Sequence, residues 1–299
     1  MTLGKALDNF IITKQAEGLL EKSIQCYLDF CRPFVSDTGE ETDIKDLTKE
    51  VFTKYILKLQ KKETLSKTSV ATHVRHVKVF LLWIEEEYET VTGARKVKVP
   101  RTPKKVLRIY NEEEIQHIFS SVTAETEWMV ERNCAIIALM LDSGLRQNEI
   151  CTLRTADIDF KNRIVKVCGK GDKERYVPFG RISHHYLKMY MKKCPYSEET
   201  FFVARRGGAL SCNAVKLFIT KISNKLPFEF SSHKLRHNFA TNFCLNYYKK
   251  HGYVDINKLQ ILMGHEDIET TQKYVHVANK LIALQDNVSH LDNIYFGDS

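Results

Sequence analysis

Apolar positions in the first hundred residues recur at helical spacing. Between Lys67 and Glu87 they stand three or four residues apart, which is the period of one face of an α-helix. The members of this stripe are Val70, Val74, Val77, Leu81 and Ile84. A second helix is predicted from Thr48 to Leu59, and no strand pattern interrupts this part of the sequence. We therefore expect residues 1–94 to form a helical domain.

The second part of the sequence mixes helical and alternating patterns. Asn111 with Glu114 three positions later is typical of a helix cap, and an apolar run predicts a buried helix over Glu131–Leu141. Arg163–Cys168 and Glu174–Pro178 alternate between apolar and polar residues on either side of a glycine-rich turn, which predicts a hairpin. More helices follow. The expected fold is mainly α with a small antiparallel β-sheet.

A basic segment joins the two parts. Residues 95–108 contain seven basic residues, no acidic one, and two prolines that disfavour a continuous helix. The whole chain has 45 Lys and Arg against 37 Asp and Glu, a formal charge of +8. This balance favours an anionic partner, although basic linkers and solvated charged helix faces also occur in proteins without one. We expect a helical domain over 1–94, a linker over 95–108 and a second domain over 109–299.

Cysteines and apolar runs indicate where the protein works. The eight cysteines form no Cys-x-x-Cys pair, and most of them lie in apolar runs, as expected of a protein in the reducing cytoplasm. The longest apolar run, Cys134–Leu141, is far shorter than a membrane span, and the N-terminus lacks the pattern of a signal peptide. We expect a cytoplasmic protein with no membrane partner.

The second part also holds the groups that a phosphodiester transfer needs. Such a reaction requires a nucleophile, cations for the phosphate oxygens and a proton donor for the leaving 5′-oxygen. These types occur in a fixed order: Arg146 in Gly-Leu-Arg, Lys170 in Gly-Lys-Gly, His233 and Arg236 in His-Lys-Leu-Arg-His, His265 in Gly-His, and finally Tyr274. Each motif alone is common and usually structural. The interpretation therefore depends on the ordered set.

This order resembles the tyrosine recombinase (phage integrase) family, in its Xer-like and transposon-integrase branch. His265 precedes Tyr274 by nine positions and Lys170 follows Arg146 by 24, as in that branch. The resemblance spans about the whole chain. It implies a helical, SAM-like core-binding domain, a basic linker and an α+β catalytic domain. One departure is Asn238, where the family often has Thr.

The resemblance implies a role for each residue type. Tyr274 is the expected nucleophile, which forms a 3′-phosphotyrosyl bond with DNA. Arg146 and Arg236 offer planar, permanently charged forks to the nonbridging oxygens, so replacement by lysine is not conservative. Lys170 is the expected general acid, and Lys173 is its nearest rival as a turn lysine.

The two histidines complete the expected site. By resemblance, His233 assists removal of the tyrosine proton, and His265 donates a hydrogen bond to a nonbridging oxygen. His233 and Arg236 lie one helical turn apart and share a helix face. Glu149 resembles an acidic neighbour that orients the site. Neither a cofactor nor a metal ion is expected.

The expected partner is double-stranded DNA with inverted-repeat core sites. The resemblance further implies a tetramer on paired sites, coupled through a C-terminal helix that includes Asn279–Gln285 and docks into a neighbouring protomer. The alternative is a helix packed on its own domain. The residues leave open which base sequence is read. They also leave open whether the protein resolves dimers, moves a transposon or inverts a segment.

Two other functions remain as alternatives. A type IB topoisomerase shares the Arg, Lys, Arg, His and Tyr chemistry but relaxes DNA without exchanging partners. A catalytically silent DNA-binding accessory protein keeps the fold alone. The spacing between His265 and Tyr274 favours a recombinase, and the complete set of motif residues argues against a silent protein.

Overall fold

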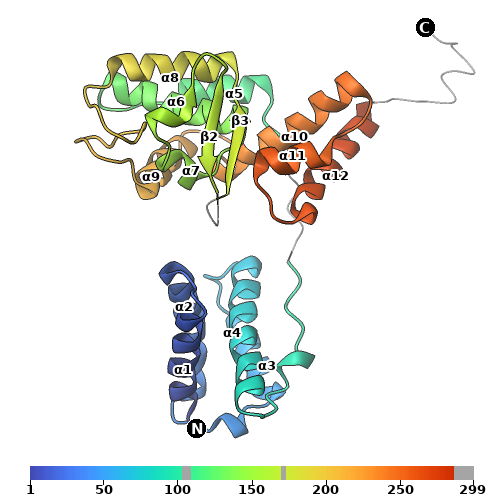
Figure 1. The fold of residues 1–299 in the computed structure, drawn as a ribbon. Helices are drawn as coiled ribbons and strands as arrows, with labels where there is room; N and C mark the ends of the chain where they lie inside the picture. Colours follow the sequence, from blue (N-terminus) through green and yellow to red (C-terminus); the bar gives the residue numbers. More distant parts are fainter. Residues whose placement is uncertain (103–108, 170–172, 286–299) are drawn as a thin grey trace, which may run out of the picture. The chain divides into compact units, whose positions relative to one another are not determined.

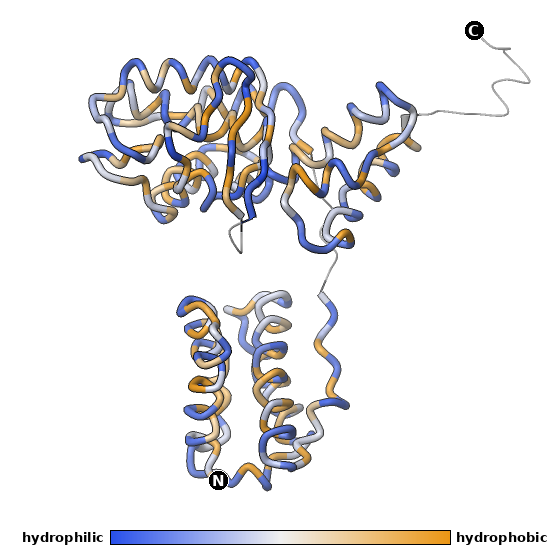
Figure 2. Tube along the Cα trace, viewed as in Figure 1, coloured by the Kyte–Doolittle hydropathy of each residue, from blue (hydrophilic) through white to orange (hydrophobic). Residues whose placement is uncertain are grey.

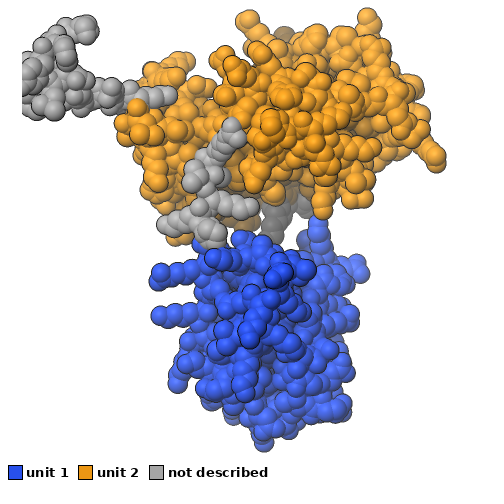
Figure 3. Space-filling view, turned by 180° about the vertical axis from the view of Figure 1, so that it is seen from behind, with its two compact units in different colours: residues 1–106 blue, residues 107–299 orange. Residues whose placement is uncertain are grey.

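The computed structural model describes residues 1–102, 109–169 and 173–285 (Figure 1). The chain forms two compact units, Met1–Val106 and Leu107–Ser299, which Figure 3 shows in different colours. Within the described ranges, every helix is too short or too polar to cross a membrane.

Unit 1 is a bundle of four α-helices with two short 3-10 helices. Its elements are α1 (Leu3–Ala16), α2 (Glu21–Thr38), η1 (Ile44–Asp46), α3 (Lys49–Gln60), α4 (Lys67–Glu87) and η2 (Ala94–Lys96). Hydroxyl side chains start three of the α-helices, because Thr2, Thr48 and Ser66 accept hydrogen bonds from backbone N–H groups of the first turn. The helices predicted in this part of the sequence are present, with α4 at the predicted bounds.

Aromatic side chains fill the core of unit 1. Phe10, Phe34, Phe52 and Phe80 are almost fully buried, and all five residues of the predicted stripe on α4 are buried with them. Hydrophobic and hydrophilic positions alternate along each of the helices, as Figure 2 shows. The burial of one apolar face per helix explains why this bundle forms without a sheet.

Unit 2 contains eight α-helices and a three-stranded antiparallel sheet among its described residues. The elements are α5 (Glu112–Ser120), α6 (Glu127–Ser143), α7 (Gln147–Cys151), η3 (Thr155–Asp157), β1 (Ile158–Asp159), β2 (Ile164–Cys168), β3 (Glu174–Pro178), α8 (Arg181–Lys193), α9 (Cys212–Ser223), α10 (Ser232–His251), α11 (Ile256–Met263) and α12 (Ile268–Gln285). The strand order is β1-β2-β3, with Lys166 opposite Tyr176. The predicted class, mainly α with a small antiparallel sheet, is confirmed.

Some boundaries differ from the expectation. The buried helix predicted over Glu131–Leu141 is α6, which is longer at both ends because amphipathic turns flank its apolar centre. Strand β1 was not predicted, since two residues are too few for a pattern. The segment Asn279–Gln285 is no separate helix: it forms the last turns of α12, with no glycine or proline to end the helix after Tyr274. There Ile282 packs on its own domain.

Two hydrophobic clusters divide unit 2 into two regions (Figure 1). The main region consists of α5 to α9 with the sheet, and the C-terminal region consists of α10 to α12. Helix α10 belongs to both clusters, because Leu235 near its start is buried in the larger cluster and Phe239, one turn later, in the smaller one. The residues between these two positions therefore lie where the regions meet.

Candidate active site

Arg146 lies at the junction of α6 and α7. Gly144 ends α6 in the left-handed conformation (φ 61°), where a Cβ would lie 2.3 Å from the Phe239 ring. Arg146 then starts α7, and its backbone N–H donates to Glu149 Oε2 at 2.7 Å. Its guanidinium donates to Glu149 Oε1 at 2.9 Å and to the Gly264 carbonyl at 2.6 Å. The side chain keeps 39% of its surface exposed, so it remains accessible to a ligand.

Arg236 lies on α10 at the meeting of the two regions and is buried. Its guanidinium donates to the carbonyl oxygens of Gly144 and Met263, the latter at 2.5 Å, and contacts His265 Nε2 at 3.2 Å. Burial, followed by the positive charge of Arg146, lowers the pKa of Arg236 to about 10. The group therefore stays positively charged at neutral pH.

A third arginine, Arg175 on β3, completes this network. It pairs through two nitrogens with both oxygens of Glu149, at 2.7 and 2.8 Å, and Arg175 and Glu149 are both buried. Burial raises the pKa of Glu149, but the hydrogen bonds and charges of Arg175 and Arg146 outweigh it and hold that pKa below its usual range. Glu149 is therefore a carboxylate that orients both arginines.

The three guanidinium groups together cap the C-terminus of α11. Arg175 donates to the carbonyl of Leu262 at 2.9 Å, Arg236 to that of Met263, and Arg146 to that of Gly264. The last carbonyls of a helix have no partner within it and carry partial negative charge, so cations stabilise this end. The cap fixes the position of the next residue, His265.

His265 follows the left-handed Gly264 (φ 59°) and uses both ring nitrogens. Nδ1 lies 2.9 Å from Thr271 Oγ1, and Nε2 lies 3.2 Å from the Arg236 guanidinium. Burial, followed by the charges of Arg236 and Arg146, lowers the pKa of His265 to about 4. The ring is therefore neutral at physiological pH.

Tyr274 lies on α12 beside two histidines. Its ring stacks nearly parallel to His265, with centroids 6.1 Å apart, and its hydroxyl lies 2.7 Å from Nδ1 of His237. The side chain is 4% exposed. Burial raises the pKa of Tyr274, while Arg236 and Arg146 act in the opposite direction. The phenol is thus protonated in this structure.

Four of the six predicted residues meet in this place. Arg146, Arg236, His265 and Tyr274 are joined by hydrogen bonds and ring contacts, as described above. His233 is exposed at the start of α10, with its ring 6.4 Å from that of His237. Lys170 lies outside the described residues. Its rival Lys173 lines a cleft of about 710 Å³ that Arg146, Arg175 and His265 also line.

The sequence interpretation assigned no role to His237 or Arg175. His237 follows Arg236 directly in the motif, but a helix turns by about 100° per residue, so its face could not be known without α12. Arg175 occupies an inward-facing position of β3, where the alternation places Val177 two residues later. A charged residue at an inward position of a strand was the available signal.

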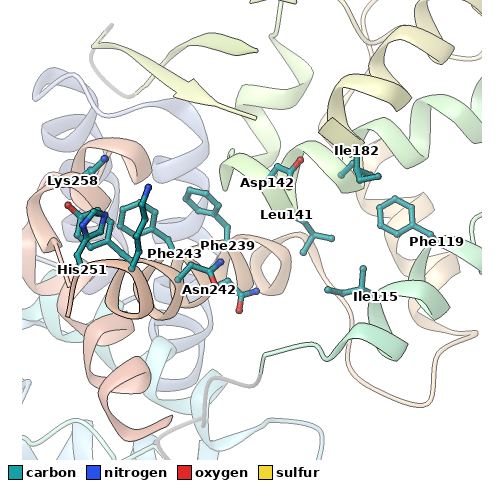
Figure 4. Close-up of a pocket in the computed structure, with 14 residues that line it drawn as sticks. Ile115, Phe119, Leu141, Asp142, Ile182, Phe239, Asn242, Phe243, His251 and Lys258 are labelled. Carbon is teal, nitrogen blue, oxygen red and sulfur yellow. The ribbon is translucent and has the colours of Figure 1, made fainter. Parts of the chain in front are cut away.

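A second cavity of about 620 Å³ lies apart from these residues, between the two regions (Figure 4). Phe119, Leu141 and Ile182 line it from the main region, and Phe239 and Phe243 from α10. Polar side chains, including Asp142 and Asn242, also line it, and Lys258 and His251 lie at one end. Within the described ranges, we find no group of three or more His, Cys, Asp or Glu side chains that could hold a metal ion.

Comparison with known proteins agrees with this geometry. Residues 108–280 match the model of the phage integrase family. The chain belongs to the phage integrase family. It is 30% identical over 286 residues to tyrosine recombinase XerC of Oceanobacillus iheyensis, a match that covers 91% of each chain. It is also 29% identical to XerC of Corynebacterium efficiens, over 73% of this chain and 70% of that one. The predicted class, a tyrosine site-specific recombinase, is confirmed.

Solved structures share the fold at lower identity. The Tn1549 transposon integrase in complex with circular intermediate DNA has a TM-score of 0.74 and 16% identity, covering 95% of this chain and 99% of that one. A lambda integrase dimer bound to a core site has a TM-score of 0.73 and 17% identity, covering 92% and 95%. At these identities the likeness concerns the fold.

Proposed function

We propose that this family member cleaves and rejoins DNA at specific sites through a 3′-phosphotyrosyl ester of Tyr274. The observation that carries the proposal is the convergence of Tyr274, His265, Arg236 and Arg146 at the end of α11. A tyrosine beside two fixed guanidinium groups is the arrangement that attack on a phosphodiester requires, because the transition state gains negative charge on the phosphate.

The residues divide the chemistry among them. Arg146 and Arg236 bind the nonbridging oxygens with charges that persist at neutral pH. His265 is neutral and its Nε2 accepts a hydrogen bond from Arg236, so it holds the guanidinium that binds a nonbridging oxygen. Lys170 protonates the leaving 5′-oxygen, and a histidine of the α10 motif, which the sequence predicts to be His233, assists removal of the tyrosine proton. Rejoining reverses these steps, and the ester conserves the energy of the broken bond.

The DNA partner is supported by charge and by relatives. The chain carries a formal charge of +8, and residues 95–102 include four of the linker's basic side chains. The structural relatives in complex with DNA include a lambda integrase bound to a core site. We propose that residues 1–94 form the core-binding domain, that residues 95–108 contact phosphate, and that the target carries inverted repeats.

We further propose a tetramer on paired sites. A lambda integrase tetramer bound to a Holliday junction shares this fold, with a TM-score of 0.70. The aromatic side chains of Phe119, Phe239 and Phe243 in the cavity of Figure 4 offer a receiving surface for the C-terminal residues of a neighbouring protomer, whose sequence includes Leu291, Ile294 and Phe296. Sedimentation on one-site and two-site DNA tests this assembly: an unchanged mass on two-site DNA would contradict it.

We also propose that the enzyme works in the cytoplasm. Four of the eight cysteines, Cys31, Cys134, Cys151 and Cys244, are buried in apolar surroundings, as suits a reducing compartment. Footprinting of the DNA that flanks the gene identifies the target site. A specific inverted repeat beside the reading frame would assign the enzyme to a mobile element.

A nicked suicide substrate tests the chemistry directly. The expected result is a covalent protein–DNA adduct with the wild type and none with Tyr274→Phe, while the exposed Tyr253→Phe serves as the matched control. Absence of the adduct in the wild type would favour the silent accessory protein. Relaxation of supercoiled plasmid without recombinant product would favour the topoisomerase.

A further inference from the structure

We propose that His237 is a further catalytic residue, whose Nδ1 accepts the hydroxyl proton of Tyr274 as the phenolic oxygen attacks phosphorus. The proposal rests on the transesterification proposed above and adds to it the identity of the proton acceptor.

The first argument is contact. Three histidines lie near the nucleophile: His233, His237 and His265. Among them, in the part of the chain that the structure describes, His237 is the one whose ring nitrogen reaches the Tyr274 hydroxyl, at 2.7 Å. A proton acceptor must lie within hydrogen-bond reach of the proton that it takes, and 2.7 Å meets that condition without movement.

The second argument is that the other two histidines have different positions. Both nitrogens of His265 are engaged, with Thr271 and Arg236, and its ring stacks face to face on Tyr274 instead of pointing at the hydroxyl. The ring of His233 lies one helical turn before His237 and is exposed. Its ring contact is with His237, at 6.4 Å between centroids.

The third argument is the rigidity of the position. The neighbouring side chain of Arg236 is tied to Gly144 and Met263, and the neighbouring Asn238 is fully buried. Asn238 accepts a hydrogen bond from the Tyr110 N–H and donates to the Lys234 carbonyl, so it anchors α10 to the start of unit 2. Asn238 therefore holds the helix that carries His237.

The fourth argument is the protonation state. Burial and the charges of His233, Arg236, Lys273 and Lys234 lower the pKa of His237, so its ring is neutral. In the proposal the ring hydrogen is on Nε2, and Nδ1 accepts the hydrogen bond of the Tyr274 hydroxyl. Burial raises the pKa of Tyr274. At rest the proton therefore stays on the phenol. It moves only when the forming bond to phosphorus makes the phenol acidic.

The step balances as follows. The Tyr274 Oη–P bond forms and the P–O5′ bond breaks, while the phenolic proton passes to His237 Nδ1. The leaving 5′-oxygen takes a separate proton from the general acid, for which Lys170 is proposed. In rejoining, the 5′-hydroxyl attacks phosphorus and gives its proton back to the amine proposed as general acid, Lys170; the Tyr274 Oη–P bond breaks, and His237 returns its proton to the departing phenolate.

The test is the single-turnover cleavage rate on a nicked suicide substrate between pH 5.5 and 9. His237→Ala should cleave about 10²- to 10³-fold more slowly than the wild type, the usual range for loss of a general base. His237→Asn places an amide near the Nδ1 position and keeps the hydrogen bond, so it should fold normally. In the wild type, protonation of His237 should slow cleavage as the pH falls. His237→Asn should lack this loss of rate. The exposed His185→Asn is the matched control.

A second substrate separates the base from the acid. Sulfur in place of the 5′-bridging oxygen leaves as a thiolate and needs no proton donor. The defect of His237→Ala should persist on this substrate, because deprotonation of Tyr274 is still required. If the sulfur substrate restored the cleavage rate of His237→Ala, His237 would act as the general acid, and the proposal would be overturned.

Other outcomes also overturn it. Wild-type rates and pH profiles in His237→Ala and His237→Asn would do so, and so would faster cleavage, which would make the contact a restraint on Tyr274. If His233→Asn alone abolished the loss of cleavage rate at low pH, His233 would be the base. Adduct formation by Tyr274→Phe would instead refute the proposed function, and it is scored in the same gel.

Discussion

The main region and the C-terminal region of unit 2 contribute different chemistry. The main region, with the larger hydrophobic cluster, supplies Arg146 and Arg175 from a helix start and a strand. The C-terminal region, with the smaller cluster, supplies His265 and the nucleophile Tyr274. The main region thus supplies two guanidinium groups, the C-terminal region supplies His265 and Tyr274, and Arg236 lies on α10 where the two regions meet.

The difference shows how a site is assembled from two cores. The regions are joined where three guanidinium groups bind successive carbonyls of Leu262, Met263 and Gly264. The same cations that are proposed to bind phosphate therefore hold the helix end that precedes His265. Substitutions at this junction should affect both stability and cleavage, while substitutions elsewhere should affect one of them.

The largest effect on stability is expected for Glu149→Ala. It leaves the buried Arg175 without its partner, and breaking a buried ion pair costs about 3–5 kcal/mol. The free energy of unfolding from urea titration measures the loss. The double variant Glu149→Leu with Arg175→Met should recover part of it, because the buried position 175 then carries no unpaired charge and Arg146 is partly exposed to solvent. A loss below about 1 kcal/mol would show that the junction does not join the two regions.

Arg236→Lys should reduce the rate of cleavage by about 10²- to 10³-fold, as expected when a preorganised donor to the transition state is lost. A lysine ammonium cannot replace the planar fork that spans Gly144, Met263 and His265. Single-turnover cleavage with saturating enzyme checks the rate. Lys234→Arg, on the neighbouring position of α10, is the control, and a rate for Arg236→Lys within threefold of wild type would contradict the assignment.

One helix cap in each region provides a matched pair of substitutions that distinguishes their roles. Asp255 caps α11 in the C-terminal region, and Ser211 caps α9 in the main region, each by accepting a backbone N–H. Replacement of either by Ala should lower the free energy of unfolding by about 1 kcal/mol. Asp255→Ala should also slow cleavage, since α11 positions His265, whereas Ser211→Ala should not. Equal cleavage rates would show that α11 does not limit the site.

The smallest effect is a change in the dependence of stability on pH. The pKa of His265 is about 4 in the folded protein against 6.5 for a free histidine. The unfolded chain therefore binds the extra proton first, so stability is full above pH 6.5 and declines as the pH falls toward 4. The side chain is partly exposed, which reduces the effect to below about 1 kcal/mol. His265→Asn should give a shallower decline of melting temperature; an unchanged slope would contradict the shift.

Much of the fold was predictable from local patterns. The stripe on α4, the Asn111 cap and the β2–β3 hairpin each depend on residues close in sequence, whose propensities agree with the final structure. The ends of α6 were not predictable in the same way, because the flanking turns are only partly apolar and Gly144 acts as a stop through its contact with Phe239, 95 residues away in the same unit.

The sequence by itself determined the family and predicted the inventory of the site, which is two arginines, a lysine, two histidines and a tyrosine in a fixed order, because these side chains carry their chemistry wherever they are placed. Only the tertiary structure decided which histidine faces Tyr274, that Arg175 joins the network, and that three arginines cap α11. These facts depend on where α10, α11 and β3 meet. The spacing of residues within one segment does not specify how distant segments pack against each other.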